Sequence, residues 1–247
     1  MPEIPDVVIL SGGFGLRLRG MIGEVPKPMA RIAGRPFLEL LLRQLKRHGF
    51  SRVVLSVGYM QEVIREHFGE KAFGLELVYS IETSPLGTGG ALREAVHHIG
   101  TQTALVMNGD SYTDVDLSHL VREHARSEAD VTVVVIPESR VDAGSVVLDP
   151  KGKVKAFAEK RPVPESRYLS AGIYMLSKSL IGGVPLGSKI SLEEQLFPQW
   201  LADGKSVEGF VCQGKCLDIG TPERYMKAQH ALEKVELETY IESEGRS

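Results

Sequence analysis

Residues 7–19 read VVILSGGFGLRLR, so four apolar residues lead directly into a loop with three glycines. An apolar run followed by glycine is typical of a buried strand and the turn after it. Glycine lets backbone amides approach a polyphosphate closely, and Arg17, Arg19 and Lys27 bring positive charge to the same region. The stretch therefore predicts a phosphate-binding loop at the end of a first strand.

The two commonest phosphate loops do not match this stretch. A dinucleotide fingerprint that starts at Gly13 finds Gly15 in place but has Leu18 where the third glycine belongs. A Walker loop that starts at Gly15 reaches Gly20 and then meets Met-Ile instead of Lys followed by Ser or Thr. A glycine loop alone is a weak signal, but here it is followed by Pro-Lys-Pro at residues 26–28, which strengthens it.

The bulk composition fits an ordinary enzyme. The chain has 247 residues, and its hydrophobic content of 43% supports a sizeable core. A net charge of -3 gives no indication of a nucleic-acid partner. No apolar run reaches the length of a membrane helix, and the first residues lack the features of a signal peptide. We therefore expect a cytoplasmic protein without a nucleic-acid or membrane partner.

The only cysteines, Cys212 and Cys216, flank a short segment that predicts a tight turn between two strands. A zinc site would need further thiol or imidazole ligands nearby, and His230 is the only candidate downstream. We interpret both cysteines as structural or incidental, in keeping with a reducing compartment.

The periodicity of the chain predicts an α/β fold. Strand and helix patterns alternate in the first half, which favours a mostly parallel sheet covered by helices on both faces. Hairpin-like segments in the second half predict an antiparallel addition. Without a linker-like stretch, we expect one domain over residues 1–247, with lobes at 1–136 and 137–220 and a C-terminal helix and tail at 221–247. The predicted strands cover 7–10, 52–57, 75–82, 104–107, 130–136, 145–148, 154–159 and 171–176, and the predicted helices cover 36–48, 61–67, 89–98, 117–126, 192–202 and 222–238.

Three loops follow predicted strands of the parallel sheet, at residues 11–19, 82–90 and 108–110. Ligands bind beyond the carboxyl ends of such strands, so the three loops are expected to meet at one cleft. Asp110 is the candidate metal ligand, because Mg²⁺ often takes only one or two carboxylates and binds against substrate phosphates. The alternative is a plain Asn-Gly-Asp turn in which Asp110 caps the next helix.

Asp218 is the candidate for a second carboxylate. It ends an apolar strand-like segment before Gly-Thr-Pro, where Thr221 suits a helix cap and Pro222 a first helical turn. A lone Asp in this position is more often structural than a ligand, so the metal role depends on further motifs.

The order of the motifs resembles that of the sugar-1-phosphate nucleotidyltransferases, over nearly the whole chain. Within that family the chain is most similar to the small D-glycero-D-manno-heptose 1-phosphate guanylyltransferases, with mannose 1-phosphate guanylyltransferases next. The resemblance implies the Rossmann-like fold of the family, with a smaller antiparallel sugar-binding lobe. The matching motifs are the glycine loop, Pro-Lys-Pro at 26–28, Pro-Leu-Gly-Thr-Gly-Gly-Ala at 85–91, Asn-Gly-Asp at 108–110, Glu-Lys at 159–160, Gly-Ile-Tyr at 172–174, Ser-Leu-Glu at 191–193 and Asp-Ile-Gly-Thr-Pro at 218–222.

Two positions depart from the family pattern. Leu16 stands where the family usually carries Thr, which removes a hydroxyl that contacts phosphate. Ser170 stands where Asn is usual, and its shorter side chain affects the expected sugar specificity more than the reaction.

The resemblance implies a role for each candidate residue. Arg17 and Lys27 would hold the triphosphate and act in catalysis together with Asp110, while Asp110 and Asp218 would bind Mg²⁺. The nucleotide would contact Leu10, Gly12, Gly13, Gly15, Arg17, Glu82, Pro85, Gly87, Thr88 and Asn108. The sugar phosphate would contact Gly109, Glu159, Lys160, Ser170, Gly172 and Glu193.

Glu82 carries the prediction of the base. A carboxylate only accepts hydrogen bonds, and guanine presents two adjacent donors on its Watson–Crick edge, whereas uracil and thymine present one donor between two carbonyls. In the family this position contacts the base, so Glu82 predicts guanine. The alternatives are a surface Glu on an edge strand or a contact to ribose.

The implied reaction is attack by a sugar 1-phosphate oxygen on the α-phosphorus of GTP, with release of pyrophosphate. The nucleophile is already ionised near neutral pH, so no general base is needed. The implied partners are GTP and a sugar 1-phosphate, and a homodimer is one option for the assembly. A different hypothesis is a nucleotide-binding regulatory subunit without turnover, with Leu16 as the trace of that loss.

Overall fold

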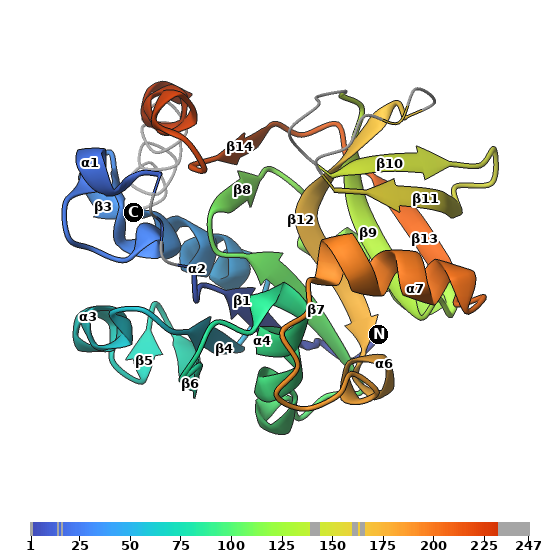
Figure 1. Ribbon diagram of the computed structural model, residues 1–247, viewed down its shortest axis with the longest axis horizontal. Coiled ribbons are helices and arrows are strands. Elements are labelled where there is room, and N and C mark those ends of the chain that lie inside the picture. The colour runs from blue at the N-terminus through green and yellow to red at the C-terminus, as the bar shows by residue number, and fades with distance from the viewer. Residues whose placement is uncertain are drawn as a thin grey trace, which may run out of the picture.

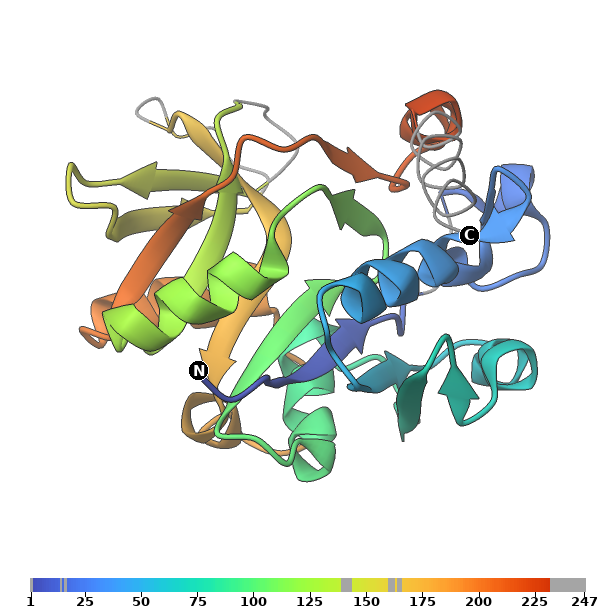
Figure 2. The same ribbon diagram turned by 180° about the vertical axis from the view of Figure 1, so that it is seen from behind.

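The computed structural model describes residues 2–13, 15, 17–138, 144–159, 163 and 166–231. A central sheet crosses the whole molecule, with helices packed on both of its faces (Figures 1 and 2). The strands are β1 Asp6–Leu10, β2 Arg31–Ile32, β3 Arg35–Pro36, β4 Arg52–Val57, β5 Lys71–Ala72, β6 Leu75–Ile81, β7 Thr103–Asn108, β8 Ser111–Thr113, β9 Val131–Ile136, β10 Ser145–Leu148, β11 Val154–Ala158, β12 Tyr168–Ser177, β13 Val207–Val211 and β14 Cys216–Asp218. The helices are α1 Arg19–Ile22, η1 Lys27–Met29, α2 Phe37–Arg47, α3 Gln61–Phe68, α4 Gly87–Ala95, η2 Val96–His98, α5 Leu117–Ser127, α6 Lys178–Gly182, η3 Leu192–Leu196 and α7 Phe197–Ala202, followed by helical residues 222–231.

The central sheet is mostly parallel in its first half. Its strands lie in the order β13-β9-β12-β7-β1-β4-β6-β5, and β1 pairs in parallel with both β4 and β7. The long strand β12 runs antiparallel between β7 and β9, and it also pairs with β10, which carries β11 on its outer edge. This architecture confirms the predicted fold class, with an antiparallel extension on one side.

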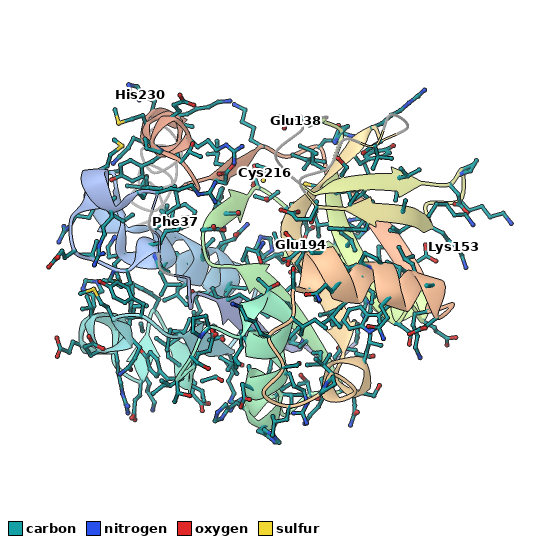
Figure 3. The ribbon with its side chains drawn as sticks, in the orientation of Figure 1. Phe37, Glu138, Lys153, Glu194, Cys216 and His230 are labelled. Carbon is teal, nitrogen blue, oxygen red and sulfur yellow. The ribbon has the colours of Figure 1, made fainter. Side chains whose placement is uncertain are left out.

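The buried strands supply two hydrophobic cores, one on each face of the sheet. Side chains alternate along a strand, so Val7 and Ile9 enter one core while Val8 enters the other. Helices α2 and α5 cover the first core, and α4, α6 and α7 cover the second (Figures 1 and 2). Burial on both faces explains why β1 is a continuous apolar run. Figure 3 shows the side chains that fill the space between the sheet and these helices.

The predicted elements recur with small shifts. The helix expected at 36–48 is α2, which buries Phe37, Leu41 and Leu45 and is followed by Gly49 at a φ of +84°. The helix expected at 192–202 is continuous, with a first, π-helical part, η3, that runs directly into the α-helix α7. The described part of the last helix, 222–231, lies within the predicted 222–238, and the rest of that range lies outside the described residues. The division of the domain into lobes stays a prediction.

The short elements β2, β3, β5, β8, α1, η1 and α6 were not expected from the sequence. The segment between Cys212 and Cys216 does lie between two strands, β13 and β14, as predicted. These strands do not form a hairpin, because β13 pairs with β9 and β14 pairs with β8. The buried Cys212 thiol donates to the carbonyl oxygen of Asp114, at 3.4 Å, and accepts from the Gly214 amide.

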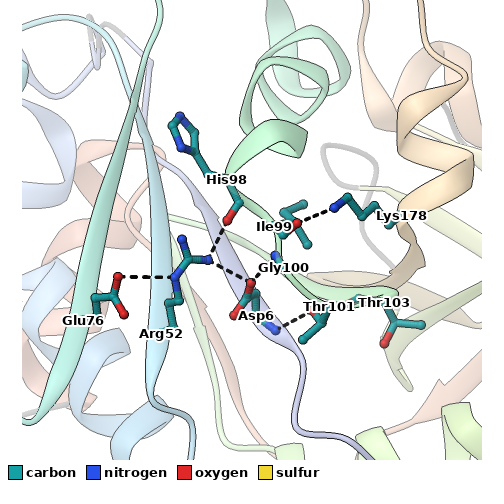
Figure 4. Close-up of polar contacts among 9 residues, drawn as sticks. All are labelled: Asp6, Arg52, Glu76, His98, Ile99, Gly100, Thr101, Thr103 and Lys178. Carbon is teal, nitrogen blue, oxygen red and sulfur yellow. Dashed lines mark hydrogen bonds and ion pairs between the residues drawn. The ribbon is translucent and has the colours of Figure 1, made fainter.

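A polar cluster fixes the amino-terminal ends of the central strands (Figure 4). Asp6 at the start of β1 accepts hydrogen bonds from Arg52 of β4, at 2.8 Å, and from the amide of Gly100, at 2.6 Å. Arg52 also donates to the carbonyl of His98, and Lys178 donates to that of Ile99. Because this cluster lies at the opposite end of the strands from the loops described next, it stabilises the sheet there. Within the described ranges, no helix is both long and apolar enough to cross a membrane.

Candidate functional site

A cavity of about 300 Å³ lies at the carboxyl ends of β1, β6 and β7. The three loops that follow these strands meet there, as the position of the loops after parallel strands predicts. Eleven of the predicted site residues line it, and Ser11, Pro28 and Ala91 line it as well. Those eleven are Leu10, Gly12, Gly13, Lys27, Glu82, Pro85, Gly87, Thr88, Asn108, Gly109 and Asp110.

The glycine loop packs closely against its neighbours. Gly15 has a φ of +59°, and a Cβ added there would lie 3.0 Å from the Cβ of Lys27. A Cβ on Gly12 would overlap the carboxylate of Glu82, so both glycines allow close approach that a larger residue would block. Arg17 is exposed and does not line the cavity. Leu16, one of the two departures from the family pattern, lies outside the described residues.

Lys27 and Asp110 form an ion pair inside the cavity. The Nζ atom of Lys27 donates to Oδ2 of Asp110 at 2.5 Å, and the Ser111 hydroxyl donates to Oδ1 at 3.1 Å. Burial by itself would raise the pKa of Asp110, but the charge and hydrogen bond of Lys27 outweigh it and hold the pKa below the ordinary value. The carboxylate is therefore ionised at neutral pH. Asp110 is followed by strand β8, so the alternative that it caps a helix is wrong; Asp116 caps α5 instead.

A short strand pair brings Asp218 next to the Asp110 segment, although Asp218 does not line the cavity itself. In the β8–β14 ladder Asp218 lies opposite Ser111, the residue after Asp110, and the amide of Ile219 donates to the carbonyl oxygen of Asp110 at 3.0 Å. Oδ1 of Asp218 accepts from the Gly220 amide at 3.0 Å and from Arg224 at 3.1 Å. The sequence motif alone did not indicate this pairing, because β8 and β14 have three residues each.

The two carboxylates suit a magnesium ion. Mg²⁺ prefers hard oxygen ligands and is usually held by one or two carboxylates, with water and substrate phosphates completing its shell. Among the residues that the structure describes, no group of three or more His, Cys, Asp and Glu side chains is arranged to hold a metal. Asp110 and Asp218 therefore fit an ion that binds together with a phosphate ligand, and they do not fit a metal bound by protein alone.

Two polar side chains at the ends of β1 and β7 have a buried atom without a partner among the described residues. They are Ser11, through Oγ, and Asn108, through Oδ1, and both line the cavity. A buried polar atom without a partner is costly, so these atoms are suited to a bound ligand or water. Ser11 was missed in the sequence, although its place directly after the first strand and before the glycines was a usable signal.

Glu82 reaches the cavity from the end of β6. Its carboxylate accepts from the amide of Leu86 at 3.3 Å and from the hydroxyl of Ser56 at 3.5 Å. Burial raises the pKa of Glu82 above its ordinary value, against the opposing effect of these two hydrogen bonds. Glu82 lines the cavity and is half-buried, so the alternative of a surface Glu is wrong.

Among the described residues predicted for the sugar phosphate, only Gly109 lines the cavity. Gly172, at a φ of +70°, lies against Asn108, since a Cβ there would come within 2.8 Å of Nδ2. Glu159 and Ser170 both border Gly144, where an added Cβ would lie 2.9 Å from Oε2 of Glu159. Lys160 lies outside the described residues.

Glu193 connects Thr88 of the cavity lining to Tyr174 of β12 through hydrogen bonds. Its Oε2 accepts from the Thr88 hydroxyl at 2.5 Å, and its Oε1 accepts from the hydroxyl of Tyr174 at 3.4 Å. The Tyr174 oxygen lies 3.1 Å from Oγ of Ser170, which in turn accepts from the Gly172 amide. Burial and the nearby Glu193 charge raise the pKa of Tyr174 well above its ordinary value, so it stays protonated as a donor. Tyr174 was not among the predicted site residues.

The sequence of the chain is similar to those of known nucleotidyl transferases. The family described as Nucleotidyl transferase matches residues 6–235. A D-glycero-alpha-D-manno-heptose 1-phosphate guanylyltransferase from Aneurinibacillus thermoaerophilus is 35% identical over 228 residues, which cover 92% of this chain and 98% of the relative. A mannose-1-phosphate guanylyltransferase from Mycobacterium tuberculosis is 37% identical over 225 residues, covering 90% of this chain and 63% of the relative.

Solved structures agree with these sequence relatives. The crystal structure of HddC from Yersinia pseudotuberculosis, complexed with GMP-PN, superimposes with a TM-score of 0.80 at 31% identity. The match covers 93% of this chain and 100% of the solved chain. With the family match spanning nearly the whole sequence, the chain belongs to the nucleotidyl transferase family.

Proposed function

We propose that this enzyme transfers GMP from GTP to a sugar 1-phosphate and releases pyrophosphate. The observation that carries the proposal is that one cavity joins the glycine loop, the Lys27–Asp110 pair and the carboxylate of Glu82. The glycine loop suits a polyphosphate, and the Lys27–Asp110 pair suits a reacting centre with a metal ion. The Glu82 carboxylate suits a base with two donors. Relatives that cover almost the full chain bear the name of heptose 1-phosphate guanylyltransferase, which supports the same reaction.

The reaction needs no proton transfer. An ionised oxygen of the sugar 1-phosphate attacks the α-phosphorus of GTP in line, a new P–O bond forms, and the bond to the β-phosphate bridge oxygen breaks. The electron pair leaves with pyrophosphate, which is a stable anion. Catalysis then comes from holding two anions together and neutralising the charge between them.

The chain supplies cations and backbone amides for that purpose. Lys27 lies at the reacting centre, with its ammonium group already directed at Asp110. Arg17 follows the glycine loop and is exposed, so it is available to the β- and γ-phosphates. Asp110 and Asp218 would hold a magnesium ion, which would supply positive charge to the reacting phosphates.

Guanine is recognised by Glu82. Its ionised carboxylate accepts from the two adjacent donors of the guanine edge, whereas a pyrimidine carbonyl would be repelled. A buried polar group left unpaired by the wrong base is costly, so one such contact discriminates strongly. The remaining contacts to the nucleotide are those of the cavity lining, with the unpartnered Ser11 hydroxyl added to the predicted set.

The sugar phosphate binds next to the cavity, on the side of β12. Lys160 holds its phosphate, and Glu159 and Glu193 contact sugar hydroxyls. The other residues that line this part of the site are Gly109, Ser170 and Gly172. The sugar is D-glycero-alpha-D-manno-heptose 1-phosphate, because relatives named for it match over nearly their whole length. Mannose 1-phosphate is the alternative, since the mycobacterial relative is equally similar over this segment. A cytoplasmic location and a homodimer stay predictions.

The test is a substrate panel. The four nucleoside triphosphates are each incubated with heptose, mannose, glucose and galactose 1-phosphates in the presence of Mg²⁺, and nucleotide sugars are detected by mass spectrometry. GDP-heptose as the dominant product supports the proposal. A UDP- or dTDP-sugar as the dominant product would contradict both the base and the role of Glu82.

A further inference from the structure

The first residue of interest is Arg224, in the helix that follows Asp218. The Thr221 hydroxyl accepts from the Arg224 amide at 3.3 Å, which fixes the first turn of this helix. From that turn the Arg224 side chain returns to Asp218, and its Nη1 lies 3.1 Å from Oδ1. Both side chains are largely buried, with 23% of Arg224 and 17% of Asp218 exposed.

The ion pair does not lie apart from the catalytic groups. A Cβ built on Gly220 would lie 2.9 Å from Oδ1 of Asp218, 3.7 Å from Nη1 of Arg224 and 3.9 Å from Nζ of Lys27. Three charged groups thus converge on one glycine, and Lys27 is in turn bound to Asp110. Two carboxylates and two cations of the chain therefore form one compact cluster.

The cluster has a consequence for metal binding. Each of the two carboxylates that fit a divalent ion already has a cationic partner from the same chain. Lys27 lines the cavity and is suited to moving onto a substrate phosphate, because its stem is flexible and its ammonium is a point charge. Arg224 does not line the cavity and is fixed by the start of its helix, so it keeps its place beside Asp218.

We infer that Arg224 is a positioning residue that orients the Asp218 carboxylate and competes with the divalent ion for it. This inference rests on the proposed metal site at Asp110 and Asp218. A guanidinium charge beside a metal ligand repels the ion and neutralises the ligand, and both effects are strong where water is largely excluded. Free metal consequently binds weakly, and the negative charge of a triphosphate is needed to offset Arg224.

The test measures binding of Mn²⁺ alone, by electron paramagnetic resonance of the free ion, so no turnover is involved. Arg224→Gln keeps a hydrogen-bond donor but removes the charge, and Arg224→Lys keeps the charge. Arg126→Gln is the matched control, because it removes an arginine from a surface ion pair with Glu123 on α5, far from the cluster. Asp218→Asn tests the metal ligand itself, and thermal melting verifies that every variant is folded.

The expected result is that Arg224→Gln tightens Mn²⁺ binding about tenfold, while Arg224→Lys and Arg126→Gln stay within about threefold of the native protein. Unchanged or weaker binding in Arg224→Gln would overturn the inference, as would equal tightening in Arg224→Lys. Asp218→Asn should weaken binding. If Asp218→Asn leaves Mn²⁺ affinity unchanged, the metal site of the proposed function is wrong, which is a different failure from that of Arg224.

Discussion

The ammonium of Lys27 lies 2.5 Å from the carboxylate of Asp110, although the two residues are 83 positions apart in the chain. The contact joins the segment after the glycine loop to the loop after β7, and both residues line the cavity. The proposed phosphate-binding cation and the proposed metal ligand are therefore already side by side in the free protein. Loss of either residue therefore changes the charge at the reacting centre directly.

Asp110→Asn should reduce turnover by about two to four orders of magnitude, because the metal loses a charged ligand at the reacting centre. The amide has nearly the same shape, so the melting temperature should stay close to that of the native enzyme. Steady-state kinetics with GTP and Mg²⁺ measure the effect, and addition of a chelator to the native enzyme should abolish activity. Full activity in chelator would exclude the metal role.

Lys27→Ala and Lys160→Ala should have different kinetic effects, because the two lysines are proposed to bind different phosphates. Lys27→Ala should lower kcat, because the ammonium acts on the charge that develops during transfer. Lys160→Ala should mainly raise KM for the sugar phosphate and leave KM for GTP nearly unchanged. Initial rates with each substrate varied in turn measure both effects, and a Lys160→Ala variant impaired only toward GTP would refute its assigned role.

Glu82→Gln should narrow the preference for GTP over UTP, because the amide presents one donor where the carboxylate had only acceptors. The native preference should also depend on pH. The guanine contact needs the ionised carboxylate, and burial raises the pKa of Glu82, so the preference is present above that pKa and declines as the pH falls through it. The decline should begin at a less acidic pH than an exposed Glu would give.

The ratio of kcat/KM for GTP to that for UTP, followed between about pH 4 and pH 7, tests the Glu82 prediction. Glu82→Gln has no carboxylate to titrate, so its ratio should be flat over the same range. A native ratio that does not change with pH, together with an unchanged ratio in the variant, would remove Glu82 from base recognition.

Gly172→Ala should destabilise the protein by about 1–3 kcal/mol, because φ is +70° and the new Cβ would meet the Asn108 side chain. The melting temperature should fall by roughly 2–4 °C for each kcal/mol. Gly182→Ala is the matched control, since a Cβ there meets no atom within 4 Å and the backbone does not require glycine. Equal melting temperatures for the two variants would show that the close approach at Gly172 is not strained.

The sequence predicted the parallel half of the fold because its cause is local. Apolar strands such as β1 and amphipathic helices such as α2 carry their own periodicity, and the three loops after the strands follow from the topology. The β8–β14 pair was not predictable in this way. It joins two strands of three residues across the chain, and it alone places Asp218 beside Asp110.

Only part of the candidate site was predicted from the sequence, for the same reason. Lys27, Glu82 and Asp110 belong to motifs of a few residues, and the structure brings them to one cavity. The contacts of Tyr174 and Arg224 depend on residues that are distant in the sequence or on a turn whose geometry the sequence does not specify. Tyr174 belongs to the Gly-Ile-Tyr motif at 172–174, but that motif did not indicate its contact with Glu193, and no motif included Arg224.

The most direct test of the proposed GMP transfer is to measure pyrophosphate release by the purified enzyme with GTP, D-glycero-alpha-D-manno-heptose 1-phosphate and Mg²⁺. If the enzyme transfers GMP to this sugar, release should require the sugar phosphate and should be lost in Asp110→Asn, and GTP should be used at a kcat/KM well above that for UTP or dTTP. Binding of GTP without pyrophosphate release under any sugar 1-phosphate would contradict it and would favour a regulatory nucleotide-binding protein.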